Sequence, residues 1–135
     1  MSNLIINKKK INKFSKPYII AEIGTNHNQS INVAKKMIVD LSKTNCDCVK
    51  FQIYESNEIV SKKIKASDYK LEKVYGDISA HKMFNKYLKT PKKWFPQLKK
   101  LTHNLGMDFA VTIHGNNGIK WAKRIKPDII KVASM

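Results

Sequence analysis

Four short segments rich in branched and aromatic apolar residues recur along the chain, and they limit the folds open to it more than any other feature. They lie at residues 18–23, 48–53, 107–112 and 128–133. Continuous apolar runs of this length are typical of strands that are buried on both faces, as in parallel sheets. The sequence therefore predicts four strands of a parallel sheet.

The segments between these strands carry apolar residues at helical spacing. Ser30 is a predicted N-cap, and the residues after it place an apolar stripe on one helical face: Ile31, Ala34, Ile38 and Leu41. A second helix is predicted to open at Thr90-Pro91 and to stop before Gly106, and a third covers 117–124. Strand and helix in alternation predict an α/β fold built from right-handed βαβ units.

Two stretches fall outside this alternation. Residues 54–89 form either an extra unit or a long excursion over one end of the sheet. They contain no β-branched run, so we expect the excursion, with a helix near 81–88. Residues 1–16 are expected to form an amino-terminal extension with a short strand or hairpin, and residues 17–135 the α/β domain.

The formal charge of +16 raises the question of a nucleic-acid partner. All basic residues but Arg124 are lysines, and no helix-turn-helix, zinc-finger or RNP pattern is present. We therefore expect no nucleic-acid partner, although a basic binding module with strongly salt-dependent affinity stays an alternative. No apolar run reaches 18 residues, and lysines interrupt residues 8–13, so we expect neither a membrane span nor secretion but a cytoplasmic protein.

Polar residues inside the predicted strands are the strongest functional signal. They are Glu22, Lys50, Gln52, Thr112 and Lys131. An unpaired buried charge costs several kcal/mol, so these residues should face a partner, a ligand or a polar cavity. Their position near the carboxyl ends of parallel strands predicts an anion site. The alternative is an ion pair of Glu22 with Lys50 or Lys131 that only stabilises the core.

The turn after the first strand adds further polar groups. Residues 24–28, Gly-Thr-Asn-His-Asn, lead to the Ser30 cap and gather amides, a hydroxyl and an imidazole at the carboxyl end of a strand. They match no nucleotide-binding fingerprint. His27 is either a hydrogen-bonded loop residue or a catalytic one.

Several of these motifs together resemble a known family. The segments 20–28 (IAEIGTNHN), 49–52 (VKFQ), 109–112 (FAVT) and 130–134 (IKVAS) are similar, in order and spacing, to the amino-terminal half of sialic acid synthases. That family makes N-acetylneuraminate and the related legionaminate and pseudaminate. The resemblance covers residues 17–135, nearly the whole chain.

The resemblance implies a partial (β/α)8 TIM barrel with about four of the eight strands, and a parent protein that also carries an antifreeze-like domain. It implies condensation of phosphoenolpyruvate with an N-acetylated hexosamine, such as N-acetylmannosamine, with release of phosphate. A divalent metal, Mn²⁺ or Mg²⁺, would polarise the sugar aldehyde, with its ligands outside this chain. The parent protein is expected to be a homodimer.

The resemblance also implies roles for individual residues. Four are expected to hold phosphoenolpyruvate: Lys50, Thr112, Lys131 and Ser134. Three are expected at the reaction centre, where a carboxylate can move protons or steady a cation: Glu22, Gln52 and His27. Asn26 belongs to the same substrate loop.

The chain departs from the family pattern in three ways. Gln29 stands where a glycine is usual, and residues 111–114 are Val-Thr-Ile-His in place of Ser-Thr-Pro-Phe. The chain also stops before a glutamate that relatives carry near the substrate, so the 135-residue polypeptide is expected to be inactive alone. The alternatives are a non-catalytic half-barrel that binds an anion or a partner, and a Schiff-base aldolase that uses Lys50 or Lys131.

Overall fold

The computed structural model describes residues 4–7 and 9–134, and a four-stranded parallel sheet forms its centre. The sheet consists, in this order, of β3 (Ile20–Gly24), β4 (Cys48–Ile53), β5 (Asp108–Ile113) and β6 (Ile129–Val132). The four predicted strands are confirmed, with small shifts at their ends. The predicted extension at 1–16 and the predicted domain at 17–135 each include residues outside the described ones, namely 1–3, 8 and 135.

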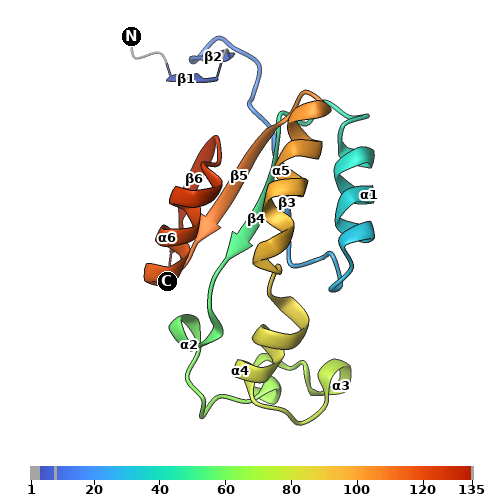
Figure 1. Ribbon diagram of the computed structural model, residues 1–135, viewed down its shortest axis with the longest axis vertical. Coiled ribbons are helices and arrows are strands. Elements are labelled where there is room, and N and C mark those ends of the chain that lie inside the picture. The colour runs from blue at the N-terminus through green and yellow to red at the C-terminus, as the bar shows by residue number, and fades with distance from the viewer. Residues whose placement is uncertain (1–3, 8, 135) are drawn as a thin grey trace.

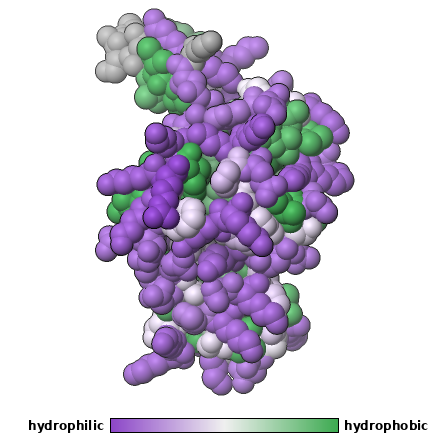
Figure 2. Space-filling view, in the orientation of Figure 1, coloured by the Kyte–Doolittle hydropathy of each residue, from purple (hydrophilic) through white to green (hydrophobic). Residues whose placement is uncertain are grey.

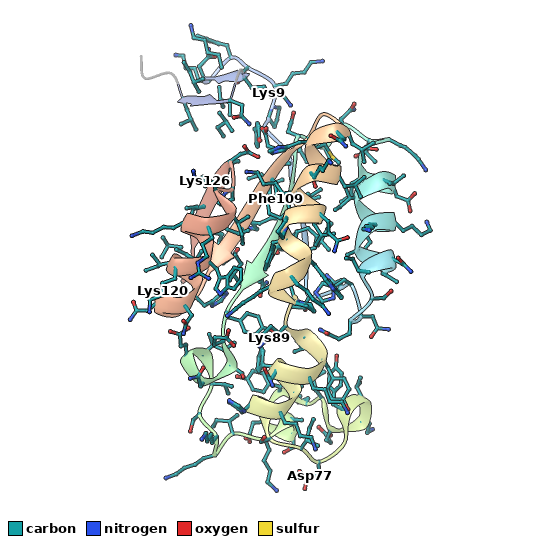
Figure 3. All side chains as sticks on the ribbon, in the orientation of Figure 1. Lys9, Asp77, Lys89, Phe109, Lys120 and Lys126 are labelled. Atoms are coloured by element: carbon teal, nitrogen blue, oxygen red, sulfur yellow. The ribbon has the colours of Figure 1, made fainter. Side chains whose placement is uncertain are left out.

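Three longer helices lie on one side of the sheet, as Figure 1 shows: α1 (Ile31–Leu41), α5 (Phe95–Asn104) and α6 (Gly115–Ile125). The Ser30 hydroxyl accepts a hydrogen bond from the backbone N–H of Val33 and so caps α1 as predicted. The main core lies between this helix layer and the sheet. Phe51 of β4 and Phe109 of β5 stack there with ring centroids 5.7 Å apart, and Figure 3 labels Phe109 behind α5.

The start of α5 differs from the prediction. Pro91 precedes a 3-10 turn, η3 (Lys92–Trp94), in which the Trp94 N–H donates to the Pro91 carbonyl, and the α-helix begins only at Phe95. Thr90 does not cap the helix, because its hydroxyl contacts the buried ring of His27. A long-range contact has therefore replaced the expected local cap.

The excursion between β4 and α5 forms a small layer beyond the carboxyl ends of the strands (Figure 1). It consists of short helical turns: α2 (Ser56–Ile59), η1 (Ala66–Tyr69), α3 (Glu72–Tyr75), α4 (Ala80–Met83) and the π-helical turn η2 (Phe84–Leu88). The helix predicted near 81–88 is therefore confirmed as α4 and η2. The excursion has its own apolar cluster around Ala66, Ala80 and Met83.

The amino-terminal extension contains a hairpin of β1 (Leu4–Ile6) and β2 (Lys9–Ile11) at the opposite end of the sheet (Figure 1). Lys9 forms an ion pair of 2.6 Å with Asp47, and Asn7 donates a hydrogen bond to Asp108 at the start of β5. The excursion and the hairpin therefore lie at opposite ends of the strands. Within the described residues no helix combines the length and the apolar character needed to cross a membrane.

The edge strand β6 is more exposed than predicted, since we expected each strand to be buried on both faces. Ile130 and Val132 of β6 are 50% and 75% exposed on the face that carries the helices. Ile130 lines a hollow with Ile119 and Ala122 of α6 but stays half exposed, whereas the central strands β4 and β5 contribute buried residues to the main core. Figure 2 shows a mostly hydrophilic surface on the helix side, with separate apolar patches.

Candidate functional site

The strand register brings five of the predicted polar residues onto one face of the sheet. Glu22 is paired with Lys50, Gln52 with Thr112, and Thr112 with Lys131. Registered residues of neighbouring parallel strands point to the same side, and side chains alternate along each strand. All five residues therefore lie on the face opposite the helices, which we call the inner face.

An ion pair occupies the first two strands of the inner face. The Lys50 ammonium lies 2.7 Å from the Glu22 carboxylate. The Lys50 side chain is only 14% exposed, whereas the Glu22 side chain is 42% exposed. The contact expected for a purely structural pair is therefore present, but the carboxylate is open to a ligand on the inner face.

The other side of the inner face carries Thr112 and Lys131. Thr112 is buried, with an exposed fraction of 5%, while Lys131 is exposed. Among the described residues Lys131 makes no ion pair, so its charge is not compensated by a carboxylate of this part of the chain. Ser134 follows β6 and is exposed, three positions beyond Lys131.

The turn after β3 shapes the site through Gly24. Its φ of +56° is unfavourable for residues with a side chain, and a Cβ there would lie 3.1 Å from Glu22 Oε1 and 3.5 Å from Gln52 Nε2. Glycine therefore lets the carboxylate and the amide lie close to the backbone. Asn26, on the exposed side of the turn, donates from its backbone and from its side chain to the Ile23 carbonyl, each at 3.0 Å.

His27 does not join the inner-face residues. Its ring is fully buried, with Nε2 2.9 Å from the Thr90 hydroxyl and Nδ1 accepting a hydrogen bond from the Gln29 N–H at 3.2 Å. The ring meets Trp94 edge-on at 5.3 Å. Because Nδ1 accepts this hydrogen bond, the ring proton of the neutral imidazole lies on Nε2. Burial lowers the pKa of the imidazole. Because both nitrogens are engaged within the protein, this geometry suits a residue that positions the loop.

Two residues at the rim of the inner face were missed as site candidates. His114 follows β5 in an extended conformation, two positions beyond Thr112, and its ring meets that of Tyr54 edge-on at 5.8 Å. Because His114 lies two positions after Thr112, alternation along the strand could have placed it on the inner face. From the sequence, His114 was identified only as a departure from the family pattern. Tyr54 continues the chain from β4 and is buried at 2% exposure.

A second charged group connects the beginning of the excursion to its end and to η3. The Glu55 carboxylate accepts hydrogen bonds from Lys89, at 3.1 Å, and from Lys92. Burial alone would raise the pKa of Glu55, but these two ammonium groups hold it below its ordinary value. Figure 3 shows Lys89 at the junction between the excursion and the sheet layer. Glu55 therefore fixes the excursion beside the rim.

The described residues do not form a metal centre by themselves, since they contain no group of three or more His, Cys, Asp or Glu side chains that could hold an ion. Cys46 and Cys48 are free thiols, and Cys48 is buried at the amino-terminal end of β4. Burial raises the pKa of the Cys48 thiol to about 12, so it is an unreactive thiol near neutral pH.

Comparison with known proteins gives a consistent set of matches. The model of the NeuB family matches residues 37–135. N-acetylneuraminate-9-phosphate synthase of Drosophila melanogaster is 32% identical over 124 residues, which cover 87% of this chain and 31% of that protein. N,N'-diacetyllegionaminic acid synthase of Campylobacter jejuni is 39% identical over 71 residues, 53% of this chain and 21% of that protein. The chain spans about a third of the length of the curated relatives it matches.

Solved structures agree with the sequence matches. The N-acetylneuraminic acid synthetase of Leptospira borgpetersenii, solved in complex with citrate, superposes with a TM-score of 0.75 at 25% identity, covering 98% of this chain and 41% of that chain. The spore coat polysaccharide biosynthesis protein SpsE of Bacillus subtilis shares the fold with a TM-score of 0.72 at 21% identity. The sheet is therefore part of a TIM barrel, which confirms the predicted fold class.

Proposed function

The chain belongs to the NeuB family, and from this premise we propose that it supplies the phosphoenolpyruvate-binding part of a sialic-acid-type synthase. The proposed reaction joins phosphoenolpyruvate to an N-acetylated hexosamine and releases phosphate. One observation carries the proposal: two lysines, a threonine, a glutamine and a glutamate share the inner face near the carboxyl ends of adjacent parallel strands. Ligands of parallel barrels bind at that end.

The inner face suits a small molecule that carries both a phosphate and a carboxylate. Lys131 has no carboxylate partner among the described residues, so an anion would compensate its charge. Lys50 can share its three N–H donors between Glu22 and a ligand, and the Thr112 hydroxyl can donate a hydrogen bond. We assign Ser134 to the same anion from the end of β6.

Glu22 is the candidate for proton movement and for charge stabilisation. When the enol carbon of phosphoenolpyruvate attacks an aldehyde, positive charge develops at the carbon that bears the phosphate oxygen. A carboxylate fixed beside that carbon stabilises this charge and can accept a proton from the water that adds there. Gln52 lies next to Glu22 across Gly24 and is assigned to orienting the substrate. His27 and Asn26 are assigned to shaping the turn.

The divalent cation is a proposal for the whole protein. The described residues include no complete ligand set, so the steps assigned above use only the side chains of this chain. We also propose that the protein acts in the cytoplasm as a homodimer.

Binding of phosphoenolpyruvate to the chain tests the proposal. We expect saturable calorimetric binding at constant ionic strength, weakened about tenfold or more by Lys50→Ala or Lys131→Ala, because each removes one charge-assisted contact. The matched control is Lys120→Ala, which is exposed on α6 (Figure 3). Binding no stronger than that of inorganic phosphate, and equal in all variants, would contradict the proposal.

Condensation is tested by phosphate release in the presence of phosphoenolpyruvate, N-acetylmannosamine and Mn²⁺. We expect no release at enzyme-like rates from the 135-residue chain alone, because the inner face is open to water. A chimera in which residues 17–134 replace the matching segment of the Leptospira synthetase is expected to release phosphate, and its Glu22→Gln form is not. An inactive but folded chimera would argue against the assigned roles.

A further inference from the structure

Two side chains near the rim of the inner face carry buried polar atoms that have no hydrogen-bond partner among the described residues. They are Oε2 of Glu58 and Nε2 of His114. A buried polar atom without a partner costs about 1–3 kcal/mol, and nearly all such atoms in folded proteins are paired with protein or water. Two such atoms beside the same turn indicate that these side chains gain hydrogen-bond partners when a further group binds there.

Glu58 holds the beginning of α6. Its Oε1 accepts a hydrogen bond of 3.2 Å from the backbone N–H of Asn117, where a carboxylate also interacts favourably with the helix dipole. A Cβ at Gly115 would lie only 2.6 Å from Glu58 Cδ, so the close approach of the carboxyl group requires glycine there. Gly115 directly follows His114, and the two unpaired atoms therefore adjoin the same turn.

His114 connects this turn to the anion site. Its backbone is extended, with φ −125° and ψ 134°, so the alternation of β5 continues and His114 points to the side of Thr112. Burial, and then the positive charge of Lys131, lower the pKa of the His114 imidazole. The titratable groups around His114 are Tyr54 after β4, whose ring it meets, and Lys131 of β6, while Glu58 of α2 lies beside the next residue, Gly115.

We propose that His114, oriented by Glu58, is an additional anion-binding residue that takes up a proton when phosphoenolpyruvate binds. The inference rests on the proposed function, because it places His114 beside the same ligand. In the bound state the Nε2–H donates to Glu58 Oε2, directly or through one water, and the Nδ1–H donates to the anion. No covalent bond changes; one proton moves from solvent to the imidazole.

The direction of proton transfer follows from the charges around His114. A bound anion offsets the charge of Lys131, which disfavours the imidazolium in the free protein. The anion also attracts the imidazolium directly. The compensation of Lys131 and the direct attraction of the anion both raise the pKa of His114 on binding, so the complex holds more protons than the free chain near neutral pH.

Calorimetry of the whole chain measures this proton uptake. Phosphoenolpyruvate is titrated at pH 7 and constant ionic strength into two buffers of different ionisation enthalpy, and the difference in apparent enthalpy gives the number of protons exchanged. We expect the wild type to take up a fraction of a proton more than His114→Gln, whose affinity falls several-fold. Protons lost by the ligand itself are common to both proteins and cancel.

Two further variants make the comparison specific. Glu58→Gln is expected to reduce the proton uptake, because a neutral amide stabilises an imidazolium less than a carboxylate does. His103→Gln is the matched control, since His103 contacts Asp128 at the other end of the sheet. It should bind and exchange protons as the wild type does. Thermal melting checks each fold, and His114→Phe, which retains a ring beside Tyr54, serves if His114→Gln unfolds.

The outcomes separate this inference from the proposed function. If Lys131→Ala weakens binding but the His114 variants match the wild type in affinity and proton count, the inference is wrong and the proposed function stands. If the wild type does not bind phosphoenolpyruvate, both are wrong. Loss of the extra proton uptake in His114→Gln and His114→Phe, with His103→Gln unchanged, supports the inference.

Discussion

At the scale of single residues, a buried neutral histidine makes stability depend on pH. Burial lowers the pKa of His27 in the folded chain below its ordinary value near 6.5. As pH falls below 6.5, the unfolded chain binds a proton that the folded chain binds only at lower pH. The free energy of unfolding therefore decreases as the pH is lowered below 6.5, by up to about 1.4 kcal/mol per pH unit for this one group.

The variant His27→Gln isolates this contribution. We expect its free energy of unfolding, from urea titrations between pH 7.5 and 5, to depend less steeply on pH than that of the wild type. His114, whose pKa is also lowered, keeps its share in both proteins. Asn28→Gly is the control, since it changes the same turn without removing an imidazole and should keep the wild-type slope. Equal slopes for wild type and His27→Gln would show that the His27 ring is not held neutral.

The pair of Glu22 and Lys50 gives a second prediction at this scale. Glu22→Gln leaves the largely buried Lys50 ammonium without its carboxylate partner, which we expect to cost about 1 kcal/mol. An anion on the inner face would replace the missing charge. Millimolar phosphate should therefore raise the melting temperature of Glu22→Gln more than that of the wild type.

The control for Glu22→Gln is Asp40→Asn on α1, where Asp40 forms exposed ion pairs with Lys36 and Lys43. Its stability should match the wild type, and phosphate should act on it as on the wild type. An equal phosphate effect on Glu22→Gln and on the wild type would argue against an anion site beside Lys50.

At the scale of elements, the turn between β3 and α1 is fastened to the excursion. Gln29 donates from Nε2 to the carbonyls of Tyr87, at 3.2 Å, and Lys89, at 2.7 Å, where the π-helical turn η2 ends. Gln29 adopts a φ of +55°, which is costly for a residue with a side chain. The hydrogen bonds to η2 compensate this local cost and explain a glutamine at a position suited to glycine.

Removal of the Gln29 side chain is expected to loosen η2. Both Gln29→Ala and Gln29→Gly should increase amide hydrogen exchange across residues 84–90 by several-fold, because two carbonyl partners are lost in each. Asn28→Gly is the matched control, since Asn28 is the neighbouring left-handed residue, with φ +46°, and is exposed. Exchange that is unchanged in both Gln29 variants would mean that the contact does not restrain the excursion.

These elements also show what the sequence could and could not predict. The apolar runs predicted the four strands, and alternation placed Lys50 and Gln52 on one face, because both depend only on local spacing. The contact of Gln29 with Lys89 spans 60 positions and leaves no periodic signal. His114 was likewise missed, because its importance depends on Glu58, which a separate element brings to the same turn.

At the scale of the whole molecule, charge is the dominant long-range term. The chain carries a formal charge of +16, and several of its ion pairs, such as Lys36 with Asp40 and Lys65 with Asp77, are exposed on both sides. Exposed pairs contribute about 0–1 kcal/mol each, and salt weakens them. Repulsion among the excess lysines opposes compaction and is screened over about 10 Å at 0.1 M salt. With so large an excess of one sign, we expect the repulsion to exceed the attraction of the pairs.

Salt should therefore stabilise the folded chain. We expect the melting temperature to rise by several degrees between low salt and 300 mM NaCl, and to rise less in Lys120→Gln/Lys123→Gln, which removes two exposed charges from α6. Phosphate at the same ionic strength should raise the melting temperature further. Lys131→Ala should abolish this additional increase, because it requires anion binding at the inner face. A melting temperature that decreases as NaCl is added would contradict this prediction, because it would show that attraction within the ion pairs exceeds repulsion among the lysines.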